Sequence, residues 1–185
     1  MKQNIFPAIR LTFVCIVIFI VIYPTLIWAV AKVAPSKGEG ETVTVNGKVV
    51  GYKLEGQSFT NDQYFNGRPS AAGYNAAGSS GSNKGPSNPE YLQQVKDRID
   101  TFLVHNPTIQ RASIPSDLVT SSGSGLDPDI SLQSALIQVD RIAKARNISK
   151  EKIESLIQKN IEESVFNKIK KINILKINIA LDELK

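Results

Sequence analysis

An uncharged apolar segment at residues 11–31 is the feature that most constrains how this 185-residue chain can fold. As an α-helix, its 21 residues would be about 30 Å long, which is the thickness of a bilayer's hydrocarbon core. Basic side chains at both ends can reach lipid headgroups, a tryptophan lies near one end, and an internal proline predicts a kink. We therefore predict a transmembrane helix over residues 11–31 with four anchoring residues: Arg10, Pro24, Trp28 and Lys32.

A cleaved signal peptide is the alternative interpretation of this segment. Its basic region would hold Lys2 and Arg10, and residues 29–31 would form an A-x-A cleavage site. A secreted soluble binding protein or hydrolase would then be released by cleavage after Ala31. The full apolar length and the tryptophan near its end favour the anchor.

Both interpretations place residues 32–185 outside the cytoplasm, because long domains cross a membrane largely regardless of their charge. In the anchored form, residues 1–10 are a cytoplasmic N-terminus. The predicted location is then the cell membrane, with one span and an extracytoplasmic soluble domain.

The formal net charge of +5 does not indicate a nucleic-acid partner. Residues 1–32 hold three basic and no acidic residues, so residues 33–185 hold the other 19 basic residues against all 17 acidic ones. A nucleic-acid footprint requires basic residues gathered on one face of the domain. Within this part, residues 33–140 carry 8 basic and 11 acidic residues, and residues 141–185 carry 11 and 6. These halves could pack on each other or meet different partners, although solvated helix faces are the simpler interpretation.

The exported part changes character along its length. All 12 glycines precede residue 126 and no proline follows residue 128, which predicts a loop-rich region over residues 38–128 and a helix-rich region over residues 129–171. Alternating isoleucines then predict a final strand at residues 172–182. A bulge or a strand buried on both faces would accommodate the break in alternation at Leu175 and Lys176.

Local signals predict individual elements within these regions. Asn46 and Gly47 between β-branched runs predict a β-hairpin, and Pro89 can start a helix that reaches about Asn106. Ser131 and Ser149 are predicted helix N-caps. The predicted fold class is α+β: a single N-terminal transmembrane helix, then a small domain with an early β-hairpin, several helices and a late strand.

The sequence predicts neither catalytic nor metal-binding residues. One cysteine, Cys15, excludes an internal disulfide, and one histidine, His105, excludes a site with two imidazoles. The glycine-rich residues 78–85 lack the spacing of a phosphate-binding loop and of a nucleophile elbow.

Aromatic residues and an arginine stand within the loop-rich region, where a flexible tether would not need them. They either pack the loop onto the domain or form a partner-binding surface, since interfaces are enriched in aromatic residues and arginine. The candidate interface consists of Phe59, Tyr64, Phe65, Gly67, Arg68, Pro69 and Ser70.

Several strings in this chain resemble those of a known family, the C subunit of the Kdp potassium-transporting P-type ATPase. They occur in the order of the family from the apolar segment to the C-terminus. The strings are GQSFT (56–60), YFNGRPS (64–70), SSGSN (79–83), SNP (87–89), LVTSSGSGLD (118–127), RIAKAR (141–146) and NIALD (178–182).

This resemblance implies an accessory, non-catalytic subunit with one uncleaved membrane helix. The implied partners are a channel-like potassium-selecting subunit, an ATP-hydrolysing P-type subunit and a small single-helix subunit. ATP and potassium are used by the complex, and no cofactor is expected on this chain. The family is also described as a catalytic chaperone that raises the ATP affinity of the hydrolysing subunit. Because ATP hydrolysis is cytoplasmic and most of this chain is expected outside, we expect any such effect to pass through the membrane helix or subunit packing.

Overall fold

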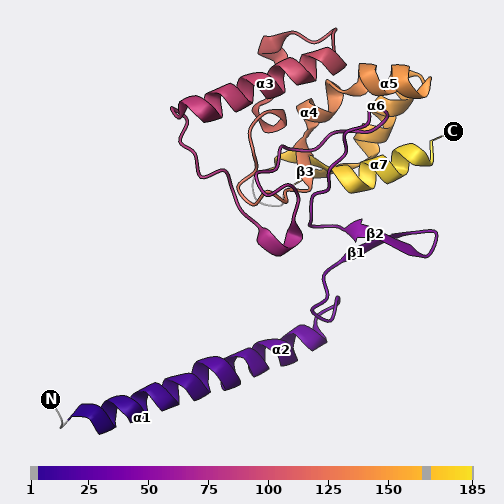
Figure 1. Cartoon of the computed structure of the whole chain (residues 1–185). Coiled ribbons are helices and arrows are strands. Elements are labelled where there is room, and N and C mark those ends of the chain that lie inside the picture. The colour runs from indigo at the N-terminus through magenta and orange to yellow at the C-terminus, as the bar shows by residue number, and fades with distance from the viewer. Residues whose placement is uncertain (1–3, 164–167, 185) are drawn as a thin grey trace. The chain divides into compact units, whose positions relative to one another are not determined.

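A computed structural model describes residues 4–163 and 168–184 of the chain (Figure 1). The chain divides into two compact units, Met1–Glu41 and Thr42–Lys185. Residues 1–3, 164–167 and 185 belong to the predicted regions but lie outside the described residues.

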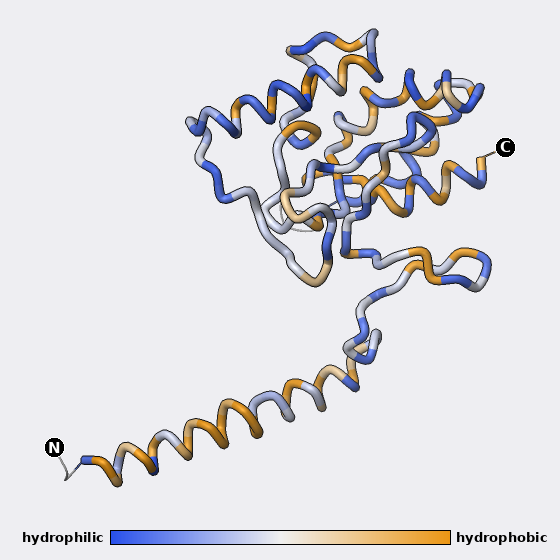
Figure 2. The backbone as a smooth tube through the Cα atoms, viewed as in Figure 1, coloured by the Kyte–Doolittle hydropathy of each residue, from blue (hydrophilic) through white to orange (hydrophobic). Residues whose placement is uncertain are grey.

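The first unit is a continuous helix of 29 residues, Ile5–Val33. It consists of α1 (Ile5–Ile16), a π-helical section (Val17–Ile22) and α2 (Tyr23–Val33). Figure 2 shows apolar residues along most of its length, and within the described residues it is the one helix long and apolar enough to cross a membrane.

Pro24 explains why the helix changes its hydrogen-bonding pattern in the middle. Proline has no backbone N–H and its ring collides with the carbonyl four residues earlier, so the regular ladder cannot continue through it. The π-helical section lies directly before Tyr23 and Pro24. The Thr25 hydroxyl donates a 2.6 Å hydrogen bond to the carbonyl of Val21, which satisfies one group of the disturbed ladder.

The second unit begins with the predicted hairpin, β1 (Thr42–Val45) and β2 (Lys48–Tyr52). The strands are antiparallel, and Asn46 and Gly47 connect them with φ angles of 50° and 76°. These two positive values are those a tight hairpin turn requires, which is why an Asn-Gly pair forms it. The hairpin prediction is confirmed.

Helices and a second, three-stranded sheet make up the rest of this unit. The helix predicted from Pro89 is confirmed as α3 (Pro89–His105), capped by the side chain of Asn88. The sheet has the antiparallel strand order β3-β5-β4. The other elements are β3 (Asp129–Ser131), α4 (Leu132–Leu136), α5 (Val139–Arg146), α6 (Lys150–Lys159), β4 (Ile161–Glu163), β5 (Lys170–Asn173), α7 (Ile174–Asp182) and three short 3-10 turns at Ala76–Gly78, Arg111–Ser113 and Ser116–Leu118.

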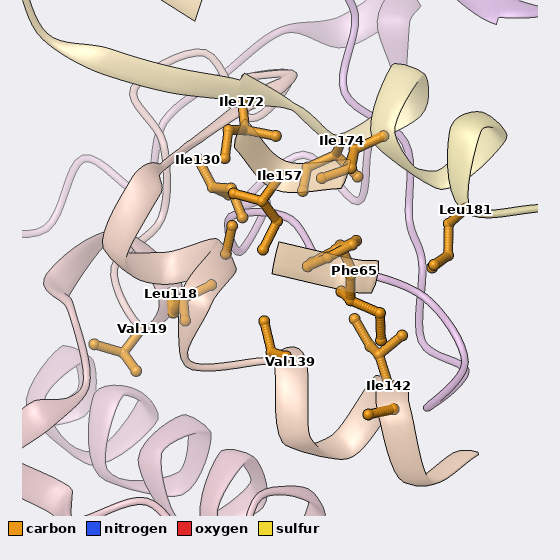
Figure 3. Close-up of a cluster of buried hydrophobic side chains, with 14 residues drawn as sticks. Phe65, Leu118, Val119, Ile130, Val139, Ile142, Ile157, Ile172, Ile174 and Leu181 are labelled. Carbon is orange, nitrogen blue, oxygen red and sulfur yellow. The ribbon is translucent and has the colours of Figure 1, made fainter. Parts of the chain in front are cut away.

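The hydrophobic core of this unit lies where α4, α5, α6 and α7 meet the three-stranded sheet. Ile172 on the central strand pairs with Ile130 on one side and Ile161 on the other. Figure 3 shows the buried side chains, which come from strands, helices and loop residues such as Phe65. A loop residue therefore belongs to the core.

The predicted bounds of the final strand, residues 172–182, are wrong. A late strand is present, but it is β5, which ends at Asn173, and residues 174–182 form helix α7. The Asn173 side chain accepts a 3.1 Å hydrogen bond from the backbone N–H of Lys176 and so caps a helix at that point. The break in alternation at Leu175 and Lys176 is the first turn of this helix rather than a bulge.

The region predicted as helix-rich, residues 129–171, contains α4, α5 and α6, but also two strands that the sequence analysis did not anticipate, β3 and β4. Ser131 caps α4 through a 3.1 Å bond from the N–H of Ser134, as predicted. Ser149 occupies the N-cap position of α6 without a side-chain capping bond. An α+β unit with an early hairpin, several helices and a late strand is confirmed.

Candidate functional site

Residues 56–70, here called the loop block, are the segment for which the sequence predicted a role. Phe65 fixes the block to the domain, because its side chain is fully buried in the core. Its backbone N–H donates to Asn178 Oδ1 at 2.8 Å, and Asn178 Nδ2 donates back to its carbonyl at 3.0 Å. One asparagine of α7 thus satisfies both backbone polar groups of a buried residue that belongs to no helix or strand.

A second side-chain amide, that of Gln138, binds both backbone groups of the next residue, Asn66. The Asn66 N–H donates to Gln138 Oε1 at 2.8 Å, and Gln138 Nε2 donates to the Asn66 carbonyl at 3.2 Å. Gln138 lies between α4 and α5 and is fully buried. Two buried amides therefore hold two successive residues of the loop block.

Arg141, on α5, is the centre of this network and is almost completely buried. Its Nη1 donates to the carbonyl of Asp62 at 2.6 Å, and its Nη2 donates to the carbonyl of Tyr64 at 3.0 Å. It also donates to three side-chain oxygens, those of Asn66 (2.7 Å), Gln138 (2.7 Å) and Asn106 (3.3 Å). The planar guanidinium suits this fan of acceptors, which a lysine could not match.

Burial lowers the pKa of the Arg141 guanidinium, and the charge of Asp62 opposes this change. The Asp62 carboxylate lies 3.7 Å from Nη1 and is itself half exposed. An arginine nevertheless stays protonated at neutral pH. The buried charge is therefore stabilised mainly by hydrogen bonds to neutral oxygens.

Tyr64 joins the loop block to the C-terminal helix. Its hydroxyl donates to Asp182 Oδ2 at 3.1 Å, and the guanidinium of Arg146 lies 4.8 Å from its ring centre. Arg146 also pairs with Asp182 at 2.6 Å, and the Phe59 ring lies 5.8 Å from that of Tyr64. Phe59 and Tyr64 are both partly exposed at the edge of this cluster.

Arg68 is half-buried and pairs with Asp127 at 2.9 Å. Its carbonyl accepts a hydrogen bond from the hydroxyl of Tyr74. Burial, and then the charge of Asp127, raise the pKa of that tyrosine, so its neutral donor form is favoured. A Cβ added at Gly67 would lie 3.6 Å from the Tyr74 hydroxyl, which is an ordinary van der Waals contact.

Pro69 and Ser70 tie the end of the loop block to a second glycine-rich loop. The carbonyl of Pro69 accepts from the N–H of Ser122 at 3.1 Å, and the Ser70 hydroxyl donates to the carbonyl of Gly125 at 2.6 Å. All seven predicted interface residues are thus brought together in one packed segment. The loop block therefore packs onto its own domain. Contact of the partly exposed side chains of the loop block with a partner stays a prediction.

Gln138, Arg141 and Asn178, which hold the block, were not predicted from the sequence, nor was Asn106, which accepts from Arg141. A usable signal existed for two of them. Gln138 and Asn178 interrupt otherwise apolar helical stripes, and a polar residue in such a stripe needs a buried partner.

Besides a groove of about 380 Å³ between the loop block and α3, two further grooves border the block. One, of about 450 Å³, lies between the hairpin and α7 and is lined by apolar side chains that include Val45, Val50, Leu175 and Ile179. The other, of about 470 Å³, includes the exposed His105, whose Nδ1 lies 2.8 Å from Asp62 Oδ1. Within residues 4–163 and 168–184 no group of three or more His, Cys, Asp or Glu side chains is placed to hold a metal ion.

The four predicted anchor residues all lie on the apolar helix. Arg10 is in α1, Pro24 is in the first turn of α2, and Lys32 is in its last turn. Trp28 is 63% exposed, and its apolar neighbours are exposed as well. The helix therefore buries no side chain within its own unit. This exposed apolar surface requires either lipid or other helices around it.

Residues 5–183 match the protein family described as "K+-transporting ATPase, c chain". The chain is 53% identical to a potassium-transporting ATPase KdpC subunit of Flavobacterium psychrophilum over 183 residues, which is 99% of this chain and 100% of that one. The KdpC subunit of Flavobacterium johnsoniae is also 53% identical, with the same coverage. That of Bacteroides fragilis is 49% identical over 188 residues, covering 99% of this chain and 98% of that one.

The matched range runs through both units, the apolar helix and the folded domain. The chain therefore belongs to the family of the K+-transporting ATPase c chain, KdpC, and is an accessory subunit of that potassium transport complex.

Proposed function

We propose that this chain is a non-catalytic subunit that an ATP-driven, high-affinity potassium import complex needs for assembly. The observation that carries the proposal is the family match over residues 5–183, which spans the exposed apolar helix and the domain together. The apolar helix buries no side chain in its own unit, and the polar groups of the loop block mainly form hydrogen bonds within the domain. Such a helix and such a domain suit a subunit that joins others.

In this proposal the helix crosses the cell membrane, residues 1–10 are cytoplasmic and residues 32–185 lie outside the cytoplasm. The partners are the potassium-selecting, ATP-hydrolysing and small single-helix subunits of the complex. The test is purification through a tag on the C-terminus of this chain. Full-length protein should be retained in the membrane and bring potassium-stimulated ATPase activity with it. Release of a chain that begins at Lys32 would instead support the secreted binding protein or hydrolase.

We further propose that this subunit raises the ATP affinity of the hydrolysing subunit without binding the nucleotide. The effect would be a coupling free energy carried by the membrane helix and subunit packing. Omitting the chain should raise the KM for ATP of any residual ATPase activity. The full-length chain alone, in lipid nanodiscs, should show no ATP binding in calorimetry, and tight binding there would contradict the indirect mechanism.

The loop block is the proposed contact with the potassium-selecting subunit. Its partly exposed side chains, among them Phe59, Tyr64 and Arg68, would form that surface. The ion pair between Arg68 and Asp127 supplies a matched control, because either Arg68→Ala or Asp127→Ala breaks it.

If Arg68 serves the partner, Arg68→Ala should lower the yield of complex and the rate of potassium uptake more than Asp127→Ala does. If Arg68 serves only the packing of the loop block, Asp127→Ala should lower both quantities at least as much, because it also removes the acceptor of the Asp129 N–H. Effects of Asp127→Ala that equal or exceed those of Arg68→Ala would therefore contradict the docking proposal while leaving membership of the complex intact.

A further inference from the structure

One face of the hairpin is exposed and nearly uncharged. Because Thr42 pairs with Tyr52 and Thr44 with Val49, these four side chains share a face, here called the outer face. All four are exposed, Val49 by 61% and Tyr52 by 40%, and Leu54, which follows the strand, is exposed by 71%. Figure 2 shows apolar residues along the hairpin.

The opposite face holds the hairpin to its own unit. Gln57 Nε2 donates to the carbonyl of Val50 at 3.0 Å. At Gly51 the backbone comes so close to α7 that an added Cβ would lie 2.9 Å from Leu175 Cδ2. The outer face is thus the side directed away from the body of the domain, and a two-stranded hairpin with one bare face is only marginally stable in water.

Three observations indicate lipid as what covers this face. Eight residues, 34–41, separate the apolar helix from β1, and three turn hydrogen bonds within residues 31–39 shorten even that connection. The two strands hold one charged side chain, that of Lys48. Lys48 pairs with Val45 on the opposite face, which leaves no charged strand residue on the outer face. Tyrosine beside aliphatic residues is the composition that favours the level of the headgroups.

We infer that the outer face of the hairpin lies in the headgroup region of the membrane, with Val49, Tyr52 and Leu54 as its apolar contacts. This inference rests on the proposed crossing of that membrane by the apolar helix. The hairpin then serves as a second, shallow attachment of the chain to the membrane, in addition to the helix.

The chain has one tryptophan, Trp28 in the apolar helix, which allows a direct test. Three full-length proteins would each carry one tryptophan: the unchanged chain, Trp28→Phe with Tyr52→Trp, and Trp28→Phe with Val104→Trp. Val104, on α3, is 77% exposed and provides a matched control on another element. Each protein is placed in vesicles of phosphatidylcholine and phosphatidylglycerol that carry bromine high or low on the acyl chain.

The Tyr52→Trp probe should be quenched several-fold more strongly than the Val104→Trp probe, and more by bromine near the headgroups than by bromine deep in the bilayer. Equal, weak quenching of these two probes while native Trp28 is quenched would overturn the inference and leave the membrane crossing intact. Absence of quenching at Trp28 would overturn the crossing, and the hairpin inference with it. Shielding of the Tyr52→Trp probe from aqueous iodide without any quenching by bromine would mean that protein covers the face, which also overturns it.

Discussion

Arg141 joins three separate parts of the chain through one side chain. It reaches the loop block, the end of α3 and the start of its own helix, and every acceptor is a carbonyl or amide oxygen. A buried charge of this kind depends on complete hydrogen bonding, because each lost acceptor leaves a buried N–H group without a hydrogen bond.

Replacing Arg141 with lysine should therefore destabilise the domain although the charge is kept. Lysine lacks the planar fork and cannot reach the carbonyls of Asp62 and Tyr64 together. We expect a loss of about 3 kcal/mol in the free energy of unfolding, followed by urea denaturation of the full chain in detergent. Lys144→Ala, an exposed change on the same helix, should alter it by no more than about 0.5 kcal/mol. Equal stabilities of the two variants would show that the fork is not required.

Glu162 and Lys176 should make stability depend on acid. A hydrogen bond from Lys176 Nζ at 2.5 Å lowers the pKa of the Glu162 carboxyl below its ordinary value of 4.5 in the folded state. A lowered folded-state pKa stabilises the protein above the unfolded pKa, and that contribution is lost as the pH falls through the folded value. Between about pH 6 and about pH 3, the melting temperature of Glu162→Gln should fall less than that of the unchanged protein. Lys176→Met should behave alike because it removes the same bond, and an undiminished fall in Glu162→Gln would refute the assignment.

The residues of the loop block show what a sequence can and cannot predict at this scale. Its aromatic residues correctly indicated a segment that is not a tether. The destination of Phe65 could not be predicted, because the amide that binds both of its backbone groups lies at Asn178, far along the chain. An aromatic residue in a loop has no periodicity that would separate a core position from a surface one.

At the scale of elements, helix α7 depends on its cap. Asn173 accepts from the N–H of Lys176, and its Nδ2 donates to the carbonyl of Lys53 at 2.8 Å. Asn173→Ala should lower the free energy of unfolding by about 2 kcal/mol, since it removes both the cap and a buried donor. Ser149→Ala, at a cap position without a side-chain bond, should cost clearly less. Thermal unfolding of the two variants compares them directly, and equal losses would contradict the capping role.

Elements with a strong local signal were the ones predicted correctly. The Asn-Gly turn and the prolines around α3 act over a few residues, so their effect is visible in the sequence. Strands β3 and β4 have three residues each, too short to display an alternation, and they exist because β5 pairs with both. The strand predicted through residue 182 failed for the related reason that an apolar run suits a buried strand and a buried helix equally.

For the whole molecule, the proposed crossing of the membrane predicts which parts can be labelled from outside. In a Cys15→Ser background, Ser149→Cys in intact cells stripped of any outer barrier should react with a membrane-impermeant maleimide. Asn4→Cys should react only after the membrane is opened. Both positions are exposed in the folded chain, so accessibility of the thiol does not differ for structural reasons. The reverse pattern would place the domain in the cytoplasm and contradict the proposed topology.

The way the loop block is held also fixes the order in which the domain can fold. Phe65 and Asn178 are 113 positions apart, and Tyr64 and Asp182 are 118 apart. A chain that leaves the ribosome or the export channel N-terminus first therefore presents the loop block long before its partners arrive. Until α7 is complete, the core position of Phe65 is unfilled and its backbone groups have no amide to bind. The domain can consequently acquire its native structure only after α7 has been made, and loss of α7 would leave the loop block without the groups that hold it.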